Sequence, residues 1–175
     1  MKYSGHLESI DRLGLMGWDV LLVGWDRGWV TREDVSRFAI DRLLSEAVGS
    51  DDMNTVMSLA LAESEKLDHL DIKALLESLI RDSFDQKTAI GKDKWRLVVL
   101  ISLDAEPLDW EAKVNTLQEV MAEFGYPPDM SHCFRYGPSQ FAIDKGLASQ
   151  EDLKRDPLEE MKRVIGDLKD RLCPE

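Results

Sequence analysis

The class of fold depends on one stretch of the chain, Trp95-Arg96-Leu97-Val98-Val99-Leu100-Ile101-Ser102-Leu103. Its β-branched residues fit either a buried strand or a helix that is apolar on all sides. No second run of comparable β character exists to pair with it, and a lone strand would leave its backbone hydrogen-bonding groups unsatisfied. We therefore favour a helix over residues 95–103, which Pro107 ends, and an all-α fold.

The sequence before this stretch has the apolar spacing of helices. The pattern Thr31-x-x-Asp34 suits an N-terminal cap, and it predicts a helix that runs to Gly49. A second helix is expected from Ser50–Asp52 to about Lys66, because acids suit the positive end of a helix dipole. The core positions predicted for these two helices are Val35, Phe38, Ala39, Leu43 and Ala47, and then Met53, Val56, Met57, Ala60 and Leu61.

A third helix is predicted after Asp68 or Asp71. We expect Phe84 to close its last turn and Gly91 to separate it from the following element. Its predicted core positions are Ile72, Leu75, Leu76, Leu79 and Ile80.

Two further amphipathic helices follow residue 107. One is predicted over Asp109–Phe124 and stops at Gly125; the other begins after a cap at Asp156, with Pro157 at its first position. A short helix after Ser149 precedes the second. Their predicted core positions are Trp110, Val114, Leu117, Met121 and Phe124, and then Met161, Val164, Leu168 and Leu172. The whole chain, residues 1–175, is expected to form a single domain, an irregular bundle of about seven helices.

The segment Phe124–Pro138 joins these last helices, and we call it the joint. It is rich in aromatics, glycine and proline. In one interpretation, Tyr126, Phe134 and Tyr136 fill the space where the helix breaks at Pro127, while Arg135 pairs with a carboxylate. In the other, Arg135 and Tyr136 are exposed and touch a partner, because Arg and Tyr are enriched among interface anchors.

The segment Gly17–Trp29 contains Gly-Trp-Asp twice, seven residues apart, without the longer repeats that a propeller requires. Trp18, Leu22 and Trp25 would share one helix face. This spacing is typical of core packing, although one tryptophan exposed for a partner is the alternative. Gly28 would release the chain into a turn.

The joint and this tryptophan-rich start together resemble a family of small, acidic, mostly helical bacterial proteins, often found as immunity proteins beside polymorphic or contact-dependent toxins. The resemblance extends from Trp18 to about Pro138. It implies a cytoplasmic protein that binds a cognate toxin domain, blocks it by contact alone, and needs neither catalysis nor a cofactor.

The net charge of the chain also fits a protein that binds a basic partner. The chain carries 34 acids against 22 lysines and arginines, a net charge of −12, which argues against unaided binding to nucleic acid. A small basic island, Lys87, Lys92, Lys94 and Arg96, interrupts the acidic sequence. The acids could simply form a solvated face, or they could capture a basic partner. For the second case, the residues predicted to face the partner are Asp51, Asp52, Glu63, Glu65, Asp68 and Asp71.

Neither a signal peptide nor a membrane span is expected, because the start of the chain is interrupted by Glu8 and Asp11 and the longest apolar runs are short. Cys133 and Cys173 have no spacing typical of a redox pair or zinc site, so we expect two reduced thiols in a cytoplasmic protein.

Enzymatic chemistry is not expected. His6, His69 and His132 are widely separated, and motifs for phosphate or dinucleotide binding and nucleophile elbows are absent. Three carboxylate pairs have the helical spacing of magnesium-dependent all-α nucleotide phosphohydrolases, namely Glu8 with Asp11, Asp156 with Glu159, and Asp167 with Asp170. They do not form an ordered array.

The expected function is therefore that of an immunity protein. A helical adaptor with another basic partner is the first alternative, and the phosphohydrolase is the second. The toxin and the oligomeric state remain open.

Overall fold

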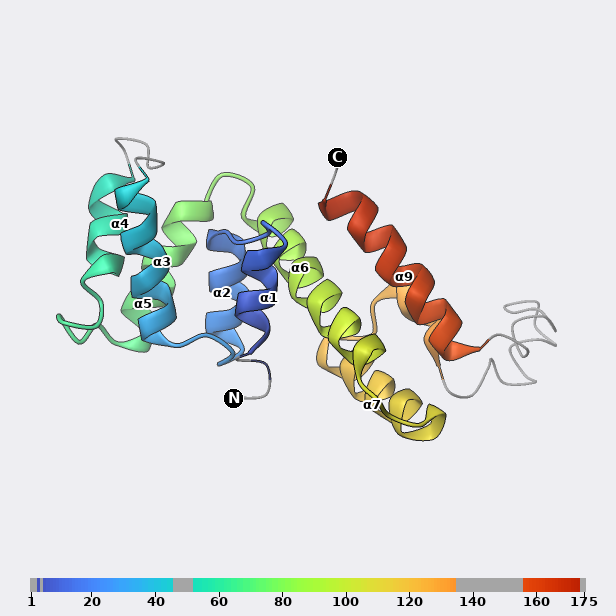
Figure 1. Cartoon of the computed structure of the whole chain (residues 1–175). Coiled ribbons are helices and arrows are strands. Elements are labelled where there is room, and N and C mark those ends of the chain that lie inside the picture. Colours follow the sequence, from blue (N-terminus) through green and yellow to red (C-terminus); the bar gives the residue numbers. More distant parts are fainter. Residues whose placement is uncertain (1–2, 4, 46–51, 135–155, 174–175) are drawn as a thin grey trace. The chain divides into compact units, whose positions relative to one another are not determined.

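The computed structural model describes residues 3, 5–45, 52–134 and 156–173. These residues form helices and no strand, which confirms the all-α prediction (Figure 1). The helices are α1 (His6–Arg12), α2 (Trp18–Asp26), α3 (Arg32–Leu44), α4 (Met53–Ala60), α5 (His69–Ile80), α6 (Phe84–Ala105), α7 (Trp110–Glu123), the 3-10 helix η1 (Pro128–Cys133) and α9 (Pro157–Leu172). Residues 95–103 lie inside α6, so the helix favoured for this stretch is confirmed.

The chain divides into two compact units, Met1–Trp95 and Arg96–Glu175, and the boundary falls within α6. We call them unit 1 and unit 2 and describe each by itself. That the chain forms a single domain stays a prediction.

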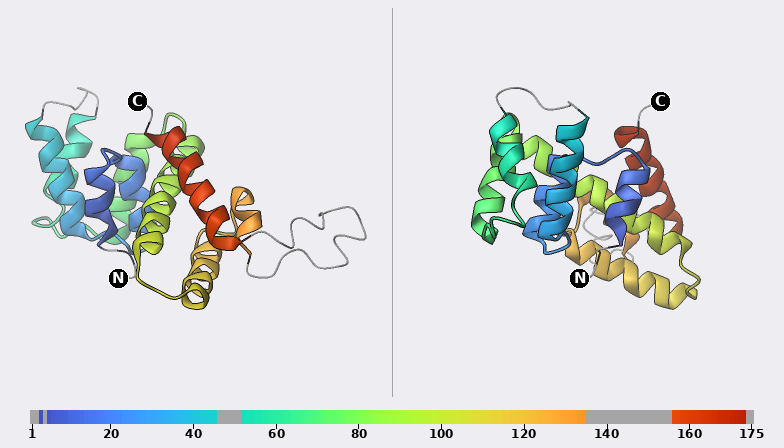
Figure 2. Two further views of the ribbon diagram at one scale, coloured as in Figure 1. Left: turned by 45° about the vertical axis from the view of Figure 1, so that its right-hand side comes forward. Right: turned by 60° about the vertical axis from the view of Figure 1, so that its left-hand side comes forward.

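In unit 1, α2 is buried along most of its length. Residues 20–25 are all buried, including Leu22 and Trp25 of the predicted tryptophan-rich face. The helix packs against α5, while α3 packs against α4, and these neighbours lie side by side in Figures 1 and 2. The indole nitrogen of Trp95 donates a hydrogen bond of 2.9 Å to the backbone oxygen of Val20, which fastens the first half of α6 to α2.

The prediction that Gly91 breaks the chain is wrong. It lies in the interior of α6, and Phe84 begins that helix instead of closing α5, which ends at Ile80. A Cβ atom at Gly91 would lie 2.5 Å from the backbone oxygen of Asp19. The glycine is therefore required because α2 and α6 approach closely, and it has no role as a helix stop.

The predicted start of α3 is confirmed. Thr31 and Asp34 form a capping box, in which the Asp34 amide donates to the Thr31 hydroxyl at 3.1 Å and the Thr31 amide donates to the Asp34 carboxylate at 2.9 Å. Gly28, with φ +65°, ends α2 as predicted, because its left-handed backbone closes the last turn.

The prediction for α4 is partly wrong. The helix ends at Ala60, and Val56 and Leu59 are its buried residues. Met53, Met57 and Leu61, predicted to be core, are exposed. The apolar spacing was recognised, but α4 buries the side that faces α3 and α5 and leaves a second apolar side uncovered. Ala47 and Gly49 lie outside the described residues.

In unit 2, α9 packs against η1 and α7 (Figure 2). The predicted core of α9 is confirmed at Met161, Val164 and Leu168, and Asp156 caps the helix by accepting a hydrogen bond from the Leu158 amide at 3.0 Å.

In α7, Trp110 is exposed, contrary to the prediction. It lies in the first turn of the helix, where its indole nitrogen donates a hydrogen bond to the Asp156 carboxylate at 3.3 Å. The predicted short helix after Ser149 lies outside the described residues.

Within the described part of the chain, no helix combines the length and the apolar character that are needed to cross a membrane.

Candidate partner-binding surface

A groove on the surface of unit 1 runs between α1 and α3. Three apolar residues line it, namely Leu7, Met16 and Phe38, and we call them its apolar floor. Four carboxylates and one guanidinium also line it: Glu8 and Asp11 come from α1, and Asp34, Arg37 and Asp41 from α3. The hollow has a volume of about 210 Å³, and it continues toward Gly14, Arg42 and Ser45, because the adjoining hollow shares Asp11, Met16, Phe38 and Asp41 with it. We call this the acidic groove.

Two of the four carboxylates already have partners inside the chain. Asp34 closes the capping box of α3 and also pairs with Arg37 at 2.7 Å, while Glu8 pairs with Arg12 at 3.4 Å. Asp11 and Asp41 are exposed and make no ion pair with any other described residue. Their charges are therefore available to a cation from outside.

The aromatic floor connects the groove to α2. Phe38 meets Trp18 edge to face, with 4.8 Å between the ring centroids, and the guanidinium of Arg42 lies 4.9 Å above the Phe38 ring. Trp18 is half-buried, so it is less enclosed than the core anchor predicted for it. The contact with Arg42 shows that a guanidinium can pack against the ring of Phe38.

The structure divides the acids that the sequence predicted to face a partner. Asp52 is at the start of α4, whereas Glu63, Glu65, Asp68 and Asp71 follow its end, so roughly 12 Å of helix separates the two groups. Glu63 and Glu65 are exposed in the turn before α5. Asp51, Arg135 and Tyr136 lie outside the described residues.

Asp68 and Asp71 have a structural role of their own, because they form the capping box of α5. The Asp71 amide donates to the Asp68 carboxylate at 2.8 Å, and the Asp68 amide donates to the Asp71 carboxylate at 3.3 Å. Both side chains remain exposed. Their spacing before an apolar helix is a capping signal, so the sequence holds the information needed to assign them this role.

Beside this cap, His69 stacks on Trp25 with 4.8 Å between ring centroids, and the Trp25 indole nitrogen donates to the His69 backbone oxygen at 3.1 Å. One turn later, Lys73 pairs with Asp26 at 2.9 Å, and this hydrogen bond raises the pKa of the lysine. These contacts tie α5 to α2. Sequence analysis did not single out Lys73, because an isolated lysine on an amphipathic helix gives no signal.

The first residues of the joint end α7 and turn the chain toward η1. Gly125 has φ +74°; its amide donates to the Ala122 oxygen and that of Tyr126 to the Met121 oxygen, the pattern of a Schellman motif. Tyr126 and Phe134 stack on each other across the break after α7, with 6.1 Å between ring centroids, and both side chains are exposed. The buried residues are Met130 and Cys133, since η1 turns its apolar side inward.

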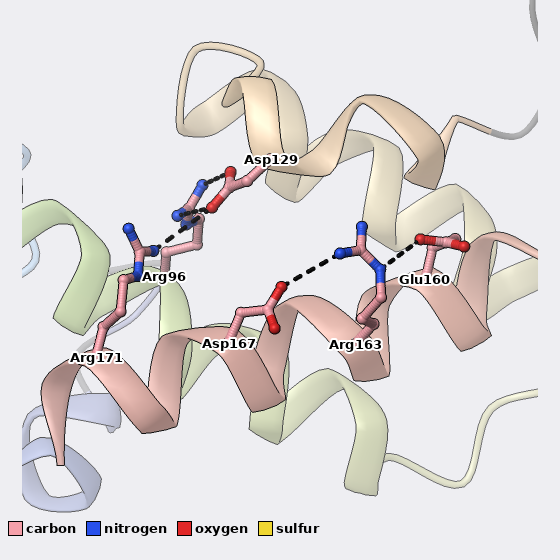
Figure 3. A network of polar contacts seen from close by, with 6 residues as sticks. All are labelled: Arg96, Asp129, Glu160, Arg163, Asp167 and Arg171. Carbon is pink, nitrogen blue, oxygen red and sulfur yellow. Dashed lines mark hydrogen bonds and ion pairs between the residues drawn. The ribbon is translucent and has the colours of Figure 1, made fainter. Parts of the chain in front are cut away.

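Arg96 holds the joint in place (Figure 3). Its guanidinium is almost completely buried and makes a two-pronged contact with Asp129 at 2.6 and 2.7 Å, and Arg171 of α9 approaches the same carboxylate at 3.6 Å. Nearby on α9, Arg163 pairs with Glu160 and Asp167. This network binds α6, η1 and α9 together and is structural.

Two of the four residues of the basic island therefore form ion pairs within the chain. Lys94 pairs with the buried carboxylate of Asp19 at 2.8 Å, and Arg96 pairs with Asp129.

Among the described residues, no three histidine, cysteine, aspartate or glutamate side chains come together in a way that could hold a metal ion. Cys133 is buried and Cys173 is exposed, and both are free thiols.

Comparison with curated proteins and with solved structures gives no match. A family of bacterial proteins matches residues 8–173, which include the four carboxylates of the acidic groove and the joint. The description of that family names no activity and no partner. The chain belongs to this family, which is described as an uncharacterized protein conserved in bacteria (DUF2247).

Proposed function

We propose that this protein is an immunity protein, which binds a basic toxin domain and neutralises it by direct contact. The observation that carries the proposal is the acidic groove, where Asp11 and Asp41 lie exposed beside an apolar floor and pair with no cation of the described residues. A lysine or arginine of the partner would place its charge between these carboxylates and its aliphatic stem against Phe38.

The net charge of −12 supports the same partner. An acidic surface attracts a basic protein before contact and speeds its association, while an apolar floor contributes to slow dissociation. Neutralisation by binding requires both, because inhibition follows mass action.

The first experiment is a salt-resistant pull-down from the native bacterium with this protein as bait, followed by identification of the recovered proteins. Each stoichiometric partner is then expressed with and without this protein. A basic domain that kills cells only in the absence of this protein supports immunity. A basic partner without toxicity would contradict immunity and support the adaptor alternative.

Charge reversal then tests the groove. In the variant with Asp11→Lys and Asp41→Lys, association with the partner should slow by about tenfold or more and should depend less on salt. The matched control carries Glu119→Lys and Asp170→Lys, two exposed acids of unit 2 whose reversal changes the net charge by the same amount. Equal slowing in both variants would show that net charge acts without the groove.

The acids Glu63 and Glu65 form a second pair to reverse, because they belong to the set predicted from the sequence. They are better probes than Asp68 and Asp71, since reversing the latter would also remove the capping box of α5. If only this pair slows association, the partner contacts the turn before α5 and the groove assignment is wrong.

A further inference from the structure

The hairpin of α3 and α4 leaves five large apolar side chains exposed, between 38% and 77% of each surface. Single exposed apolar residues are normal on a protein surface. Four of these five, however, lie on two helices that pack against each other, and the fifth, Leu61, directly follows one of them. We call them the apolar stripe; they are Ile40, Leu44, Met53, Met57 and Leu61.

Helix geometry places the five residues in two adjacent rows. Ile40 and Leu44 are one turn apart on α3. Met53 and Met57 are one turn apart on α4, and Leu61, which caps the end of α4, follows one turn later. The Ser36 hydroxyl donates to the Ala60 backbone oxygen at 2.5 Å, which sets the register of the antiparallel pair. Counting one turn from this contact, Ile40 lies level with Met57, and Leu44 with Met53.

The charged residues at the margins of the stripe are mostly acidic. Asp41 follows Ile40 on α3, Asp52 precedes α4, and Glu63 and Glu65 follow it, against one lysine, Lys66. Two of the three arginines of α3 make contacts within the chain: Arg37 pairs with Asp34, and Arg42 lies over Phe38. The apolar stripe is therefore bordered mainly by negative charge.

This charge pattern decides between occupants. In a symmetric dimer through the stripe, each acid would meet the same acids of a second copy, each carrying a net charge of −12. A bacterial membrane surface carrying anionic lipid would repel the same margins. A basic protein segment meets neither obstacle, and the two methionines can adapt their shape to its side chains.

We propose that the apolar stripe is the docking site for an amphipathic helix of a basic partner. Apolar residues at every third or fourth position of that helix lie on the stripe, and lysines or arginines beside them face Asp41, Asp52, Glu63 and Glu65. The inference rests on the proposed function in that the helix belongs to the neutralised protein.

Two synthetic peptides of about 18 residues, roughly five helical turns, serve as probes. Both have leucines at the same helical spacing; the remaining positions are mainly lysine in one and glutamate in the other. Binding to the full-length protein is followed through the methyl resonances of its methionines. The lysine peptide should shift Met53 and Met57 with saturation and leave Met121 and Met161, which are buried in unit 2, unchanged.

The decisive variant is Leu44→Gln, which should weaken binding of the lysine peptide by about tenfold or more, since a leucine contact is lost. Its matched control is Leu70→Gln on α5, because Leu70 is 73% exposed and Leu44 is 77% exposed. Both side chains are exposed, so both variants should fold. Equal affinities of the two variants, or equal binding of the glutamate peptide, would overturn the proposal. Self-association that Leu44→Gln abolishes would also overturn it, by showing that a second copy occupies the stripe.

This test separates the two proposals. If the lysine peptide binds the stripe and no toxic partner exists, the immunity function fails and the docking site stands. If a toxic partner is recovered and Leu44→Gln leaves its affinity unchanged, the docking site alone fails.

Discussion

Arg96 and Asp129 show how one ion pair can connect a helix to a segment more than 30 positions later in the chain. Arg96 is almost fully buried, whereas Asp129 is 40% exposed, so the arginine depends on the aspartate for its charge compensation. The sequence shows both residues, but nothing in their spacing, 33 positions apart, predicts that they meet. Contacts between distant positions in the sequence depend on packing that local patterns do not encode.

We expect Asp129→Asn to lower the free energy of unfolding by about 2–3 kcal/mol, because it leaves the buried guanidinium without its counter-charge. Asp167→Asn is the control, since the pair of Asp167 with Arg163 is exposed and should contribute at most about 0.5 kcal/mol. Chemical denaturation of the two variants measures the difference. Equal stabilities would mean that solvent compensates Arg96.

The two free thiols should differ in reactivity. Burial, reinforced by the negative charge of Glu160, raises the pKa of the Cys133 thiol to about 12, while Cys173 is exposed. Near pH 8, iodoacetamide should label Cys173 in the native protein and should label Cys133 only after unfolding, as peptide mass spectrometry would show. Rapid native labelling of Cys133 would contradict its burial.

The same shift has a consequence for stability at alkaline pH. The unfolded thiol loses its proton near its ordinary pKa of 9.0, while the native thiol keeps it until about 12. The native state binds more protons in this interval, so this contribution to stability is full below pH 9.0 and is lost toward pH 12. A Cys133→Ala variant should lose less stability than the parent over that range.

At the scale of elements, the sequence predicted which segments are helical better than how they pack. The capping box at Thr31 and the cap at Asp156 are local, and both predictions are confirmed. The sequence predicts a break at Gly91, because glycine is a common helix stop. The glycine instead allows α6 to pack closely on α2, which lies more than 60 positions earlier in the chain. The residues around Gly91 do not show that α2 packs there. The exposed side of α4 was missed for the same reason, since an apolar spacing does not say which of its residues will be covered.

Gly91→Ala should destabilise the protein by about 1–3 kcal/mol, because the new methyl group meets the backbone of Asp19, which cannot move alone. Gly166→Ala in α9 provides the opposite case: no atom lies within 4 Å of the added Cβ, so the helix should gain about 0.5–1 kcal/mol. Thermal and urea unfolding of both variants would check the signs. Stabilisation by Gly91→Ala would show that α2 and α6 are not in close contact.

At the scale of the whole molecule, charge is the property that composition predicts directly, and its placement is the property that required a structure. The acids named from the sequence are split by α4, and two of them cap α5. Asp11 and Asp41, the open carboxylates of the acidic groove, are absent from the set predicted to face a partner, and the whole of α2 separates them in the sequence. Only the fold brings α1 and α3 together.

The excess of acids should also act on stability without any partner. A net charge of −12 repels itself, and salt screens this repulsion over distances longer than about 10 Å at 0.1 M. We therefore expect the melting temperature to rise by roughly 2–4 °C between about 10 and 150 mM NaCl. Replacing Glu63 and Glu65 by lysine adds two charges at each position and takes the net charge from −12 to −8, so the rise should shrink. A melting temperature that falls with salt would instead show that attractive pairs such as Lys94 with Asp19 outweigh the repulsion, because salt weakens them as well.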